Sequence, residues 1–277
     1  MPVSGSTVTR RQLGRWLRGL RDAAGKTDSD VEEANVASPA KLWRIETGRV
    51  SIKVGDVRAL CWLYGTDAKT TNAFADLAAA TTGHGWWEDN EIQPTRNGLY
   101  LGLEAIAGSV LAYDAERVPA LLQTPDYIRA LAAIDDPSAD RSVLQERVKL
   151  GVERQCVLTT RVPPLRLTAV LGEGALARRV AGPAVMAEQF HRLQELAQQQ
   201  PHIDIRVLTW RAGAHPAMRG GAFNILDFAS DDDPAVVHVE GHTGARYFER
   251  RSELDEYRRV FARVYRQAVP ISEYKRA

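Results

Sequence analysis

A short stretch near the N-terminus, SPAKLWRIETGR at residues 38–49, constrains the fold of this chain more than any other feature. Ser38 followed by Pro39 indicates a helix start, because the serine hydroxyl can accept a backbone N–H and proline fits the first helical position. Gly48 indicates the end of that helix, since glycine adopts a left-handed cap conformation at little cost. The stretch therefore predicts a short helix with two sharp boundaries.

Comparable short helices are expected on both sides of this stretch, giving five amphipathic helices between residues 10 and 80. Thr27 is a plausible N-cap for the second helix, which we expect to extend to about Ala34. Gly25 follows the first helix. The apolar positions that define the first, fourth and fifth helices are Leu13, Trp16, Leu17 and Leu20; Val54, Val57, Leu60, Cys61 and Tyr64; Phe74 and Leu77.

Two short helices joined by a tight turn meet the physical needs of a helix-turn-helix, whose second helix enters the major groove of DNA. On the helix after Ser38, Leu42 and Ile45 are expected to point inward. Arg44 is the candidate for reading guanine, because a guanidinium can bond O6 and N7 together. The expected DNA-binding set is Thr27, Ser38, Ala40, Lys41, Trp43, Arg44 and Arg49, with Lys41 and Arg49 suited to phosphates.

A second domain of different character follows. We expect domains at residues 1–82 and 99–277, with a linker at 83–98 in which Trp86 and Trp87 form a hinge contact. Strands are predicted at 165–171, 203–209, 222–228, 236–240 and 245–249, in a mixed or antiparallel sheet. Helices are predicted at 99–113, 125–133, 141–159, 183–200 and 252–268. The fold class is therefore α+β, with helices that flank the sheet.

Composition fits a chain that folds as a soluble protein in the cytoplasm, with 44% hydrophobic and 26% charged residues among 277. The first residues lack the apolar core of a signal peptide, and no apolar stretch is long enough to span a membrane. The net charge is +1, but residues 10–53 carry ten Lys or Arg against six Asp or Glu. Cys61 and Cys156 are both expected to be buried thiols, and no cofactor is expected.

The motif residues also support a family resemblance. SPAKLWRIETGR followed by DVRALCWLYG resembles the Cro/XRE helix-turn-helix family of bacterial regulators. GWWED, YLGLEA, RVPALLQTPDY, AGAHP, VVHVEGHTG and ARYFE resemble regulators typified by WhiJ-like proteins. This resemblance implies a DNA-binding domain ahead of a C-terminal regulatory domain, and an antitoxin-like arrangement with small partner proteins.

The second helix departs from the family pattern at four positions: Asp28, Glu32, Asn35 and Val36. An acid at Asp28 opposes a phosphate at the helix N-terminus. Glu32 falls where a small residue packs on the recognition helix, and Val36 falls where a turn glycine is usual. Trp43 replaces a small polar residue; it could stack or wedge at DNA, pack on a neighbouring subunit, or seal an unused groove.

Polar residues near the predicted strand ends are the candidates for a ligand site in the second domain. They are Glu173, Trp210, His215, Arg219, Glu240, His242 and Tyr247. Glu173 and Glu240 could form an acid–base pair with His215 as a base, whereas salt bridges and turn-stabilising hydrogen bonds need the same residue types. Four-residue spacing of His238 and His242 on a strand and turn argues against a zinc site.

Two functional hypotheses follow. The first is a sequence-specific regulator that binds double-stranded DNA as a homodimer and senses a small molecule or small protein partner in its C-terminal domain. The second is a regulator-derived protein with an eroded helix-turn-helix that binds or transforms a small metabolite. A third possibility is a pure protein-interaction module, which would form a stable complex with a small protein and have no pocket. Neither G-x-S-x-G, a P-loop nor CxxC occurs, so the sequence carries no recognisable enzyme signature.

Overall fold

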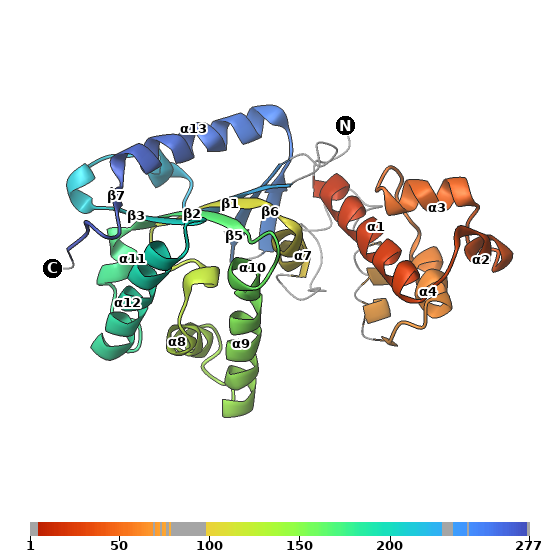
Figure 1. Cartoon of the computed structure of the whole chain (residues 1–277), viewed down its shortest axis with the longest axis horizontal. Coiled ribbons are helices and arrows are strands. Elements are labelled where there is room, and N and C mark those ends of the chain that lie inside the picture. Colours follow the sequence, from red (N-terminus) through yellow and green to blue (C-terminus); the bar gives the residue numbers. More distant parts are fainter. Residues whose placement is uncertain are drawn as a thin grey trace. The chain divides into compact units, whose positions relative to one another are not determined.

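The computed structural model describes residues 5–68, 70–72, 74–75, 78, 98–228, 235–242 and 244–275. Contacts divide the chain into two compact units, Met1–Leu103 with Gly241–Arg250, and Glu104–Glu240 with Arg251–Ala277 (Figure 1). Nearly all of the expected linker, Trp86 and Trp87 included, lies outside the described residues, as does Leu77 of the expected fifth helix. Phe74, on the same expected helix, stacks on Trp16 with ring centroids 5.5 Å apart.

The first unit begins with four helices, and the two short ones start at the caps that the sequence indicates. The four helices are α1 (Gly5–Ala23), α2 (Asp28–Glu33), α3 (Pro39–Glu46) and α4 (Val54–Leu63). Thr27 caps α2 and Ser38 caps α3, as predicted, because each side-chain oxygen accepts a backbone N–H of the first turn. Gly48 adopts φ 68° directly after the α3 cap, where a left-handed residue ends the helix.

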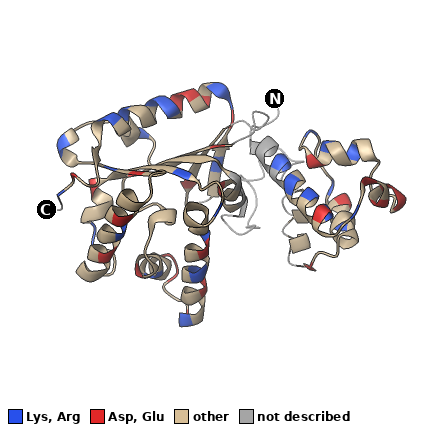
Figure 2. Ribbon diagram, in the orientation of Figure 1, with Lys and Arg blue, Asp and Glu red and all other residues tan. Residues whose placement is uncertain are grey.

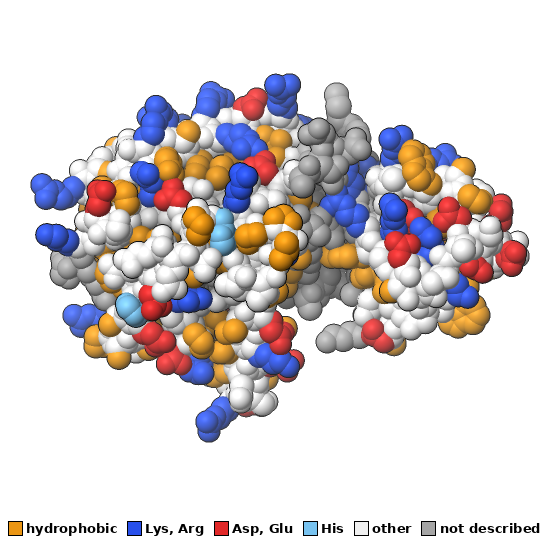
Figure 3. Space-filling model, viewed as in Figure 1, with side chains coloured by type: hydrophobic (Ala, Val, Ile, Leu, Met, Phe, Trp, Pro, Cys, Tyr) orange, Lys and Arg blue, Asp and Glu red, His pale blue; other side chains and the backbone are white. Residues whose placement is uncertain are grey.

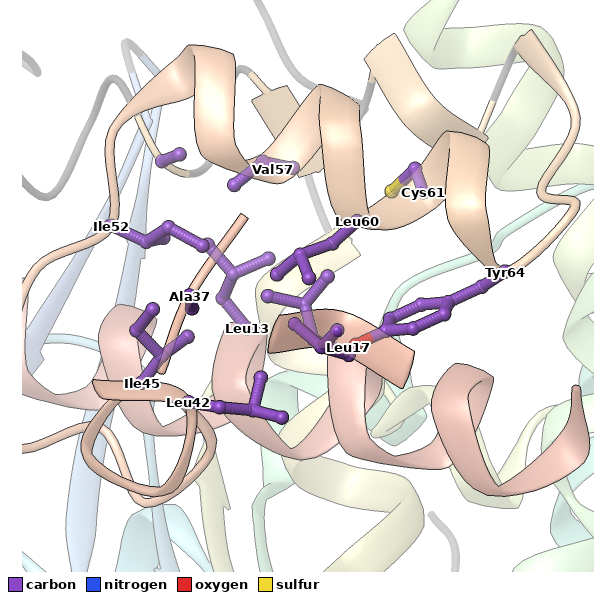
Figure 4. Packing of buried hydrophobic residues seen from close by; sticks show 12 residues of the cluster. Leu13, Leu17, Ala37, Leu42, Ile45, Ile52, Val57, Leu60, Cys61 and Tyr64 are labelled. Carbon is purple, nitrogen blue, oxygen red and sulfur yellow. The ribbon is translucent and has the colours of Figure 1, made fainter. Parts of the chain in front are cut away.

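One hydrophobic core holds these helices together (Figure 4). Leu13 and Leu17 of α1 meet Leu42 and Ile45 of α3, and α4 contributes Val57, Leu60 and Cys61. The backbones of α1 and α3 also approach closely, since a Cβ on Gly14 would lie 2.3 Å from the Ile45 carbonyl oxygen. α3 is therefore fixed along its inward side, and its other side is left for contacts outside the core.

The chain after residue 103 forms a mixed seven-stranded sheet with the order β6-β5-β4-β1-β2-β3-β7. Three adjacent strands, β1 (Ser109–Asp114), β2 (Arg166–Gly172) and β3 (Ile203–Leu208), are parallel. β4 (Phe223–Asp227) pairs antiparallel with β1 and with β5 (Val236–Gly241). The remaining strands are β6 (Gly244–Phe248) and β7 (Val269–Pro270). This arrangement confirms the predicted α+β class with a mixed sheet.

Helices cover both faces of this sheet (Figure 1). α13 (Arg251–Gln267) contacts β3 and β4 from one face. On the other face lie α8 (Pro125–Asp135), α9 (Arg141–Arg154), α10 (Cys156–Thr159), α11 (Glu173–Ala177) and α12 (Pro183–Gln199). Short 3-10 turns η1 (Ala120–Leu122), η2 (Trp210–Ala212) and η3 (Pro216–Arg219) complete the connections. None of the described helices is both long and apolar enough to cross a membrane.

Two local predictions are wrong. The helix expected over 99–113 ends early: α7 covers Gly98–Ile106, and Ser109–Asp114 forms the central strand β1. Residues 110–113 are apolar without interruption, so the sequence lacks the polar–apolar alternation that marks a half-exposed strand. Cys61 is buried as expected, but Cys156 is exposed because it begins the short helix α10 at the surface.

Candidate functional site

The exposed side of α3 contains residues that were predicted to contact DNA. Leu42 and Ile45 are buried in the core as expected, and Ala40, Trp43 and Arg44 are exposed. Trp43 keeps 51% of its surface accessible, so the tryptophan is not packed away inside its own unit. A helix anchored on one side and exposed on the other is the arrangement that a groove-entering helix needs.

Arg44 and Arg49 are held close to this face without ion pairs among the described residues. The Arg44 Nε donates to the Ala40 carbonyl oxygen at 3.1 Å, which directs the side chain back along α3. After Gly48 the chain reverses, and the Arg49 N–H donates to the Arg44 carbonyl at 2.8 Å. This turn brings the Arg49 guanidinium carbon to 4.6 Å from the centroid of the Trp43 ring, a cation–π contact.

The other predicted DNA-binding residues have structural partners. The Lys41 Nζ lies 2.7 Å from the Asp56 Oδ2 of α4, and the lysine side chain is 42% exposed. Lys41 would therefore have to share its charge between Asp56 and a phosphate. The Ser38 side chain accepts the Lys41 N–H. Thr27 forms a capping box with Asp30, whose pKa is lowered by hydrogen bonds from the Thr27 backbone and hydroxyl. Thr27 and Ser38 therefore fix the ends of two helices.

A buried ion pair that no local sequence pattern indicates lies beneath α3. Arg21 of α1 donates to both carboxylate oxygens of Glu46, at 2.7 and 3.0 Å, and to the Lys26 carbonyl at 3.1 Å. The side chains keep only 13% and 7% of their surface exposed. The bond to Glu46 raises the pKa of Arg21. Because the pair joins the end of α3 to α1 and to the turn before α2, it helps to position the reading helix.

The second helix adapts to its unusual residues in a way the sequence did not indicate. Glu32 is exposed, so the expected burial of its charge does not occur. The left-handed turn falls on Asn35, with φ 56°, one residue before Val36. The Val36 N–H then donates to the Val31 carbonyl and closes the helix, while the valine side chain packs on the core.

Helix α2 is left strongly acidic. Its sequence, DSDVEE, contains four acids and no basic residue. Figure 2 shows acidic residues along α2, and Figure 3 shows acidic side chains gathered where Figure 1 places this helix. Asp28 lies 3.3 Å from Arg21, which offsets one of these charges. The neighbourhood of α3 therefore combines a cationic face with an acidic flank.

The second group of candidates lies along one edge of the sheet. The parallel strands β1, β2 and β3 end there, β4 begins there, and β5, antiparallel to β4, ends there. Loops after the carboxyl ends of parallel strands are where open α/β sheets usually bind ligands. Glu173 follows β2, Trp210 and His215 follow β3, and Glu240 is on β5.

Glu173 and Glu240 are separated and each is already bonded. β2 and β5 lie three positions apart in the sheet, which is roughly 14 Å at normal strand spacing. Glu173 accepts the Trp210 backbone N–H at 2.7 Å and the Tyr274 hydroxyl at 3.2 Å. Glu240 pairs with Arg117 at 3.1 Å. The sheet order therefore does not support a shared acid–base pair.

The remaining candidates are spread over three elements. His215 is half-buried and packs edge-on to Tyr113, with ring centroids 5.9 Å apart; burial lowers its pKa. Trp210 is 70% exposed, and Arg219 is exposed at the end of η3. Tyr247 is half-buried on β6. His238 is buried within β5, and His242 is exposed in the turn after that strand.

The motif RVPALLQTPDY, which contributed to the family resemblance, forms a buried connection between β1 and α8. The Tyr127 hydroxyl accepts the Val118 N–H at 3.2 Å. Gln189 of α12, fully buried, accepts the Thr124 N–H and donates to the Leu122 carbonyl, both at 2.8 Å. Tyr127 of the motif and Gln189 of α12 therefore satisfy buried backbone groups of this connection.

Comparisons with known proteins match two stretches of the chain to protein families. Residues 12–74 match a helix-turn-helix domain, the class of domain that binds DNA in regulators. Residues 98–273, more than half of the chain, match a domain of unknown function, DUF5753. No curated protein and no solved structure matches the chain significantly.

Proposed function

Because the chain belongs to the DUF5753 family and carries a helix-turn-helix domain ahead of that domain, we propose that it is a transcription regulator that reads specific double-stranded DNA through α3. The observation that carries this proposal is the exposed Arg44 on a helix that the core holds from behind. An arginine in that setting can reach guanine in the major groove with two hydrogen bonds.

Binding of the full chain to a library of randomised duplexes tests this proposal. A selected sequence should bind more tightly than the unselected pool, and its affinity should fall steeply as salt rises. Arg44→Ala should weaken binding to the selected sequence by about tenfold or more, the loss of one bidentate base contact. Arg129→Ala removes the same charge from the exposed surface of α8 and should leave binding unchanged.

A homodimer is part of the proposal, since helix-turn-helix proteins commonly read two half-sites about one helical turn apart. The resemblance to the Cro/XRE family predicts a selected sequence with two-fold symmetry. Light scattering should give the mass of two chains, and the half-sites should be centred roughly 34 Å apart. A monomer on an asymmetric sequence would contradict this part alone.

The second domain is proposed to receive a small molecule or a small protein partner. Support comes from Trp210, His215 and Arg219, which lie on the segment after β3 where open sheets usually bind ligands. Native mass spectrometry of the full chain purified from its host tests this. A bound organic molecule or small protein that is lost in Trp210→Ala or Arg219→Ala supports the proposal, and a bare chain in every preparation opposes it.

A second candidate function is a protein that has lost DNA binding and acts on a metabolite through its second domain. The acidic α2 favours this candidate, because four acids beside a reading helix repel phosphates. The duplex selection separates the two candidates. Enrichment of no sequence at low salt, by a chain that remains folded, would favour the metabolite-binding protein.

A further inference from the structure

The least expected feature of the exposed side of α3 is a large aromatic ring with an arginine stacked on it. Trp43 occupies the exposed side of α3 one turn after Ala40, whose side chain is small. Arg49 covers the ring at 4.6 Å, although the indole remains 51% exposed. Stacking of a guanidinium on an aromatic ring restricts both side chains. The ring is therefore presented to the outside in a restricted position.

The backbone conformation at the end of α3 favours this contact between Arg49 and Trp43. Thr47 donates its hydroxyl to the Trp43 carbonyl at 2.7 Å, and Gly48 adopts the left-handed conformation. A Cβ on Gly48 would lie 2.6 Å from the Arg11 Cα, so this turn also needs a glycine for close packing on α1. Arg49 is thereby returned towards the helix it has just left, within reach of Trp43.

We propose that Trp43 is a specificity-determining residue that contacts the C5 methyl group of thymine in the major groove, and that Arg49 is the positioning residue that orients the indole. The thymine methyl is the apolar group that distinguishes bases in the major groove, and it is read by apolar side chains. This inference rests on the proposed DNA-binding function and adds the class of base that the protein selects beside the contact of Arg44.

Deoxyuridine provides a sharp probe, because it differs from thymidine only by that methyl group. In the duplex selected by the wild-type chain, each thymine is replaced singly by deoxyuridine, and the dissociation constant is measured. One replacement should weaken wild-type binding about fourfold, the value of one buried methyl-sized group. Trp43→Ala should bind the thymine and deoxyuridine duplexes equally.

The positioning role of Arg49 has its own readout. Arg49→Ala should lower the discrimination between thymine and deoxyuridine at the same position to about twofold, in addition to any uniform loss of affinity. A phosphate contact alone would weaken binding to both duplexes equally and leave the ratio unchanged. Trp62→Ala is the matched control, since Trp62 is an 81% exposed tryptophan on α4, and it should keep the fourfold ratio.

The outcomes separate this inference from the proposed function. If the wild-type chain selects no duplex, both fail together. If it binds a selected duplex with normal salt dependence and no thymine is methyl-sensitive, only the role of Trp43 is overturned. The same conclusion follows if Trp43→Ala keeps the wild-type ratio, or if it changes only the oligomeric state.

Discussion

The exposed face of α3 and the carboxyl edge of the sheet both gather polar and aromatic side chains, but those groups are engaged differently. On α3, Arg44 and Trp43 are exposed, and Arg44 has no ion-pair partner among the described residues. At the sheet edge, Glu173 accepts two hydrogen bonds and Glu240 pairs with Arg117. Polar groups that already satisfy one another stabilise loops, whereas a binding face must keep donors and apolar surface available.

The same residue types therefore have different roles in the two regions: exposed groups on α3 are available for binding, and bonded groups at the sheet edge stabilise loops. In the helical unit, the satisfied groups lie beneath the reading face, in the Arg21–Glu46 pair. In the second domain, the carboxylates Glu173 and Glu240 are satisfied at the edge itself, whereas Trp210 and Arg219 are exposed there. Substitutions in one region that leave the other unchanged test whether the two differ in this way.

The largest loss of stability is expected when the Arg21–Glu46 ion pair beneath α3 is broken. Glu46→Gln removes one partner of an ion pair that is almost fully buried, so the free energy of unfolding of the helical unit should fall by about 3 kcal/mol. Hydrogen exchange of α1 and α3 amides in the full chain measures it. Asp22→Asn is the control, because Asp22 also lies near Arg21, at 3.6 Å, but is 57% exposed. Equal losses in both variants would show that burial of the pair has no special role.

The second effect concerns pH and His238 in β5. Burial lowers its pKa to about 4, although Glu240 opposes the shift. The unfolded chain takes up this proton near pH 6.5, and the folded chain does so only near pH 4. Stability from neutral His238 is therefore complete above pH 6.5 and is lost as the pH falls, by about 2 kcal/mol between pH 7 and 5.

Urea unfolding at several pH values measures this slope. His238→Gln should flatten it, whatever its effect on stability at pH 7. His191→Gln, at an exposed position of α12, should keep the wild-type slope. If His238→Gln remained as sensitive to pH as the wild type, another group would account for the slope.

A smaller effect is expected at the sheet edge. Glu173→Gln weakens the bonds to the Trp210 N–H and the Tyr274 hydroxyl, so the second domain should lose about 1 kcal/mol of unfolding free energy. Affinity for the selected duplex should not change. Glu188→Gln, an exposed acid on α12, should change neither quantity. A loss of duplex affinity without a loss of stability would contradict the comparison, because the edge would then act in regulation.

The fold was predicted best where short-range chemistry decides. Thr27, Ser38 and Gly48 mark helix ends through bonds to residues three or four positions away, and the structure agrees at each. The sequence of β1 does not identify a strand, because its apolar run at residues 110–113 shows no alternation of polar and apolar positions. Strand pairing supplies the missing information, and pairing is not a local property of the sequence.

The candidate site was predicted in part for the same reason. Helical spacing predicts that Trp43 and Arg44 are exposed when Leu42 and Ile45 are buried, and they are. The contact of Arg49 with Trp43 depends on a turn whose direction periodicity does not reveal. The Arg21–Glu46 pair joins positions 25 residues apart, and no local pattern marks such partners.

The smallest effect concerns the acidic flank. Glu32 and Glu33 are exposed on α2, next in sequence to the turn that leads into α3. If α3 enters the groove, each carboxylate lies near a phosphate, and two unit charges about 10 Å apart in water repel by roughly 0.4 kcal/mol. Glu32→Gln and Glu33→Gln should therefore each tighten duplex binding about twofold at low salt, and the gain should vanish at high salt. Glu146→Gln, on the exposed surface of α9, is the matched control and should leave affinity unchanged. Equal affinity in all three variants would mean that α2 stays far from the phosphates, and α3 would then approach DNA in a different orientation from that of other helix-turn-helix proteins.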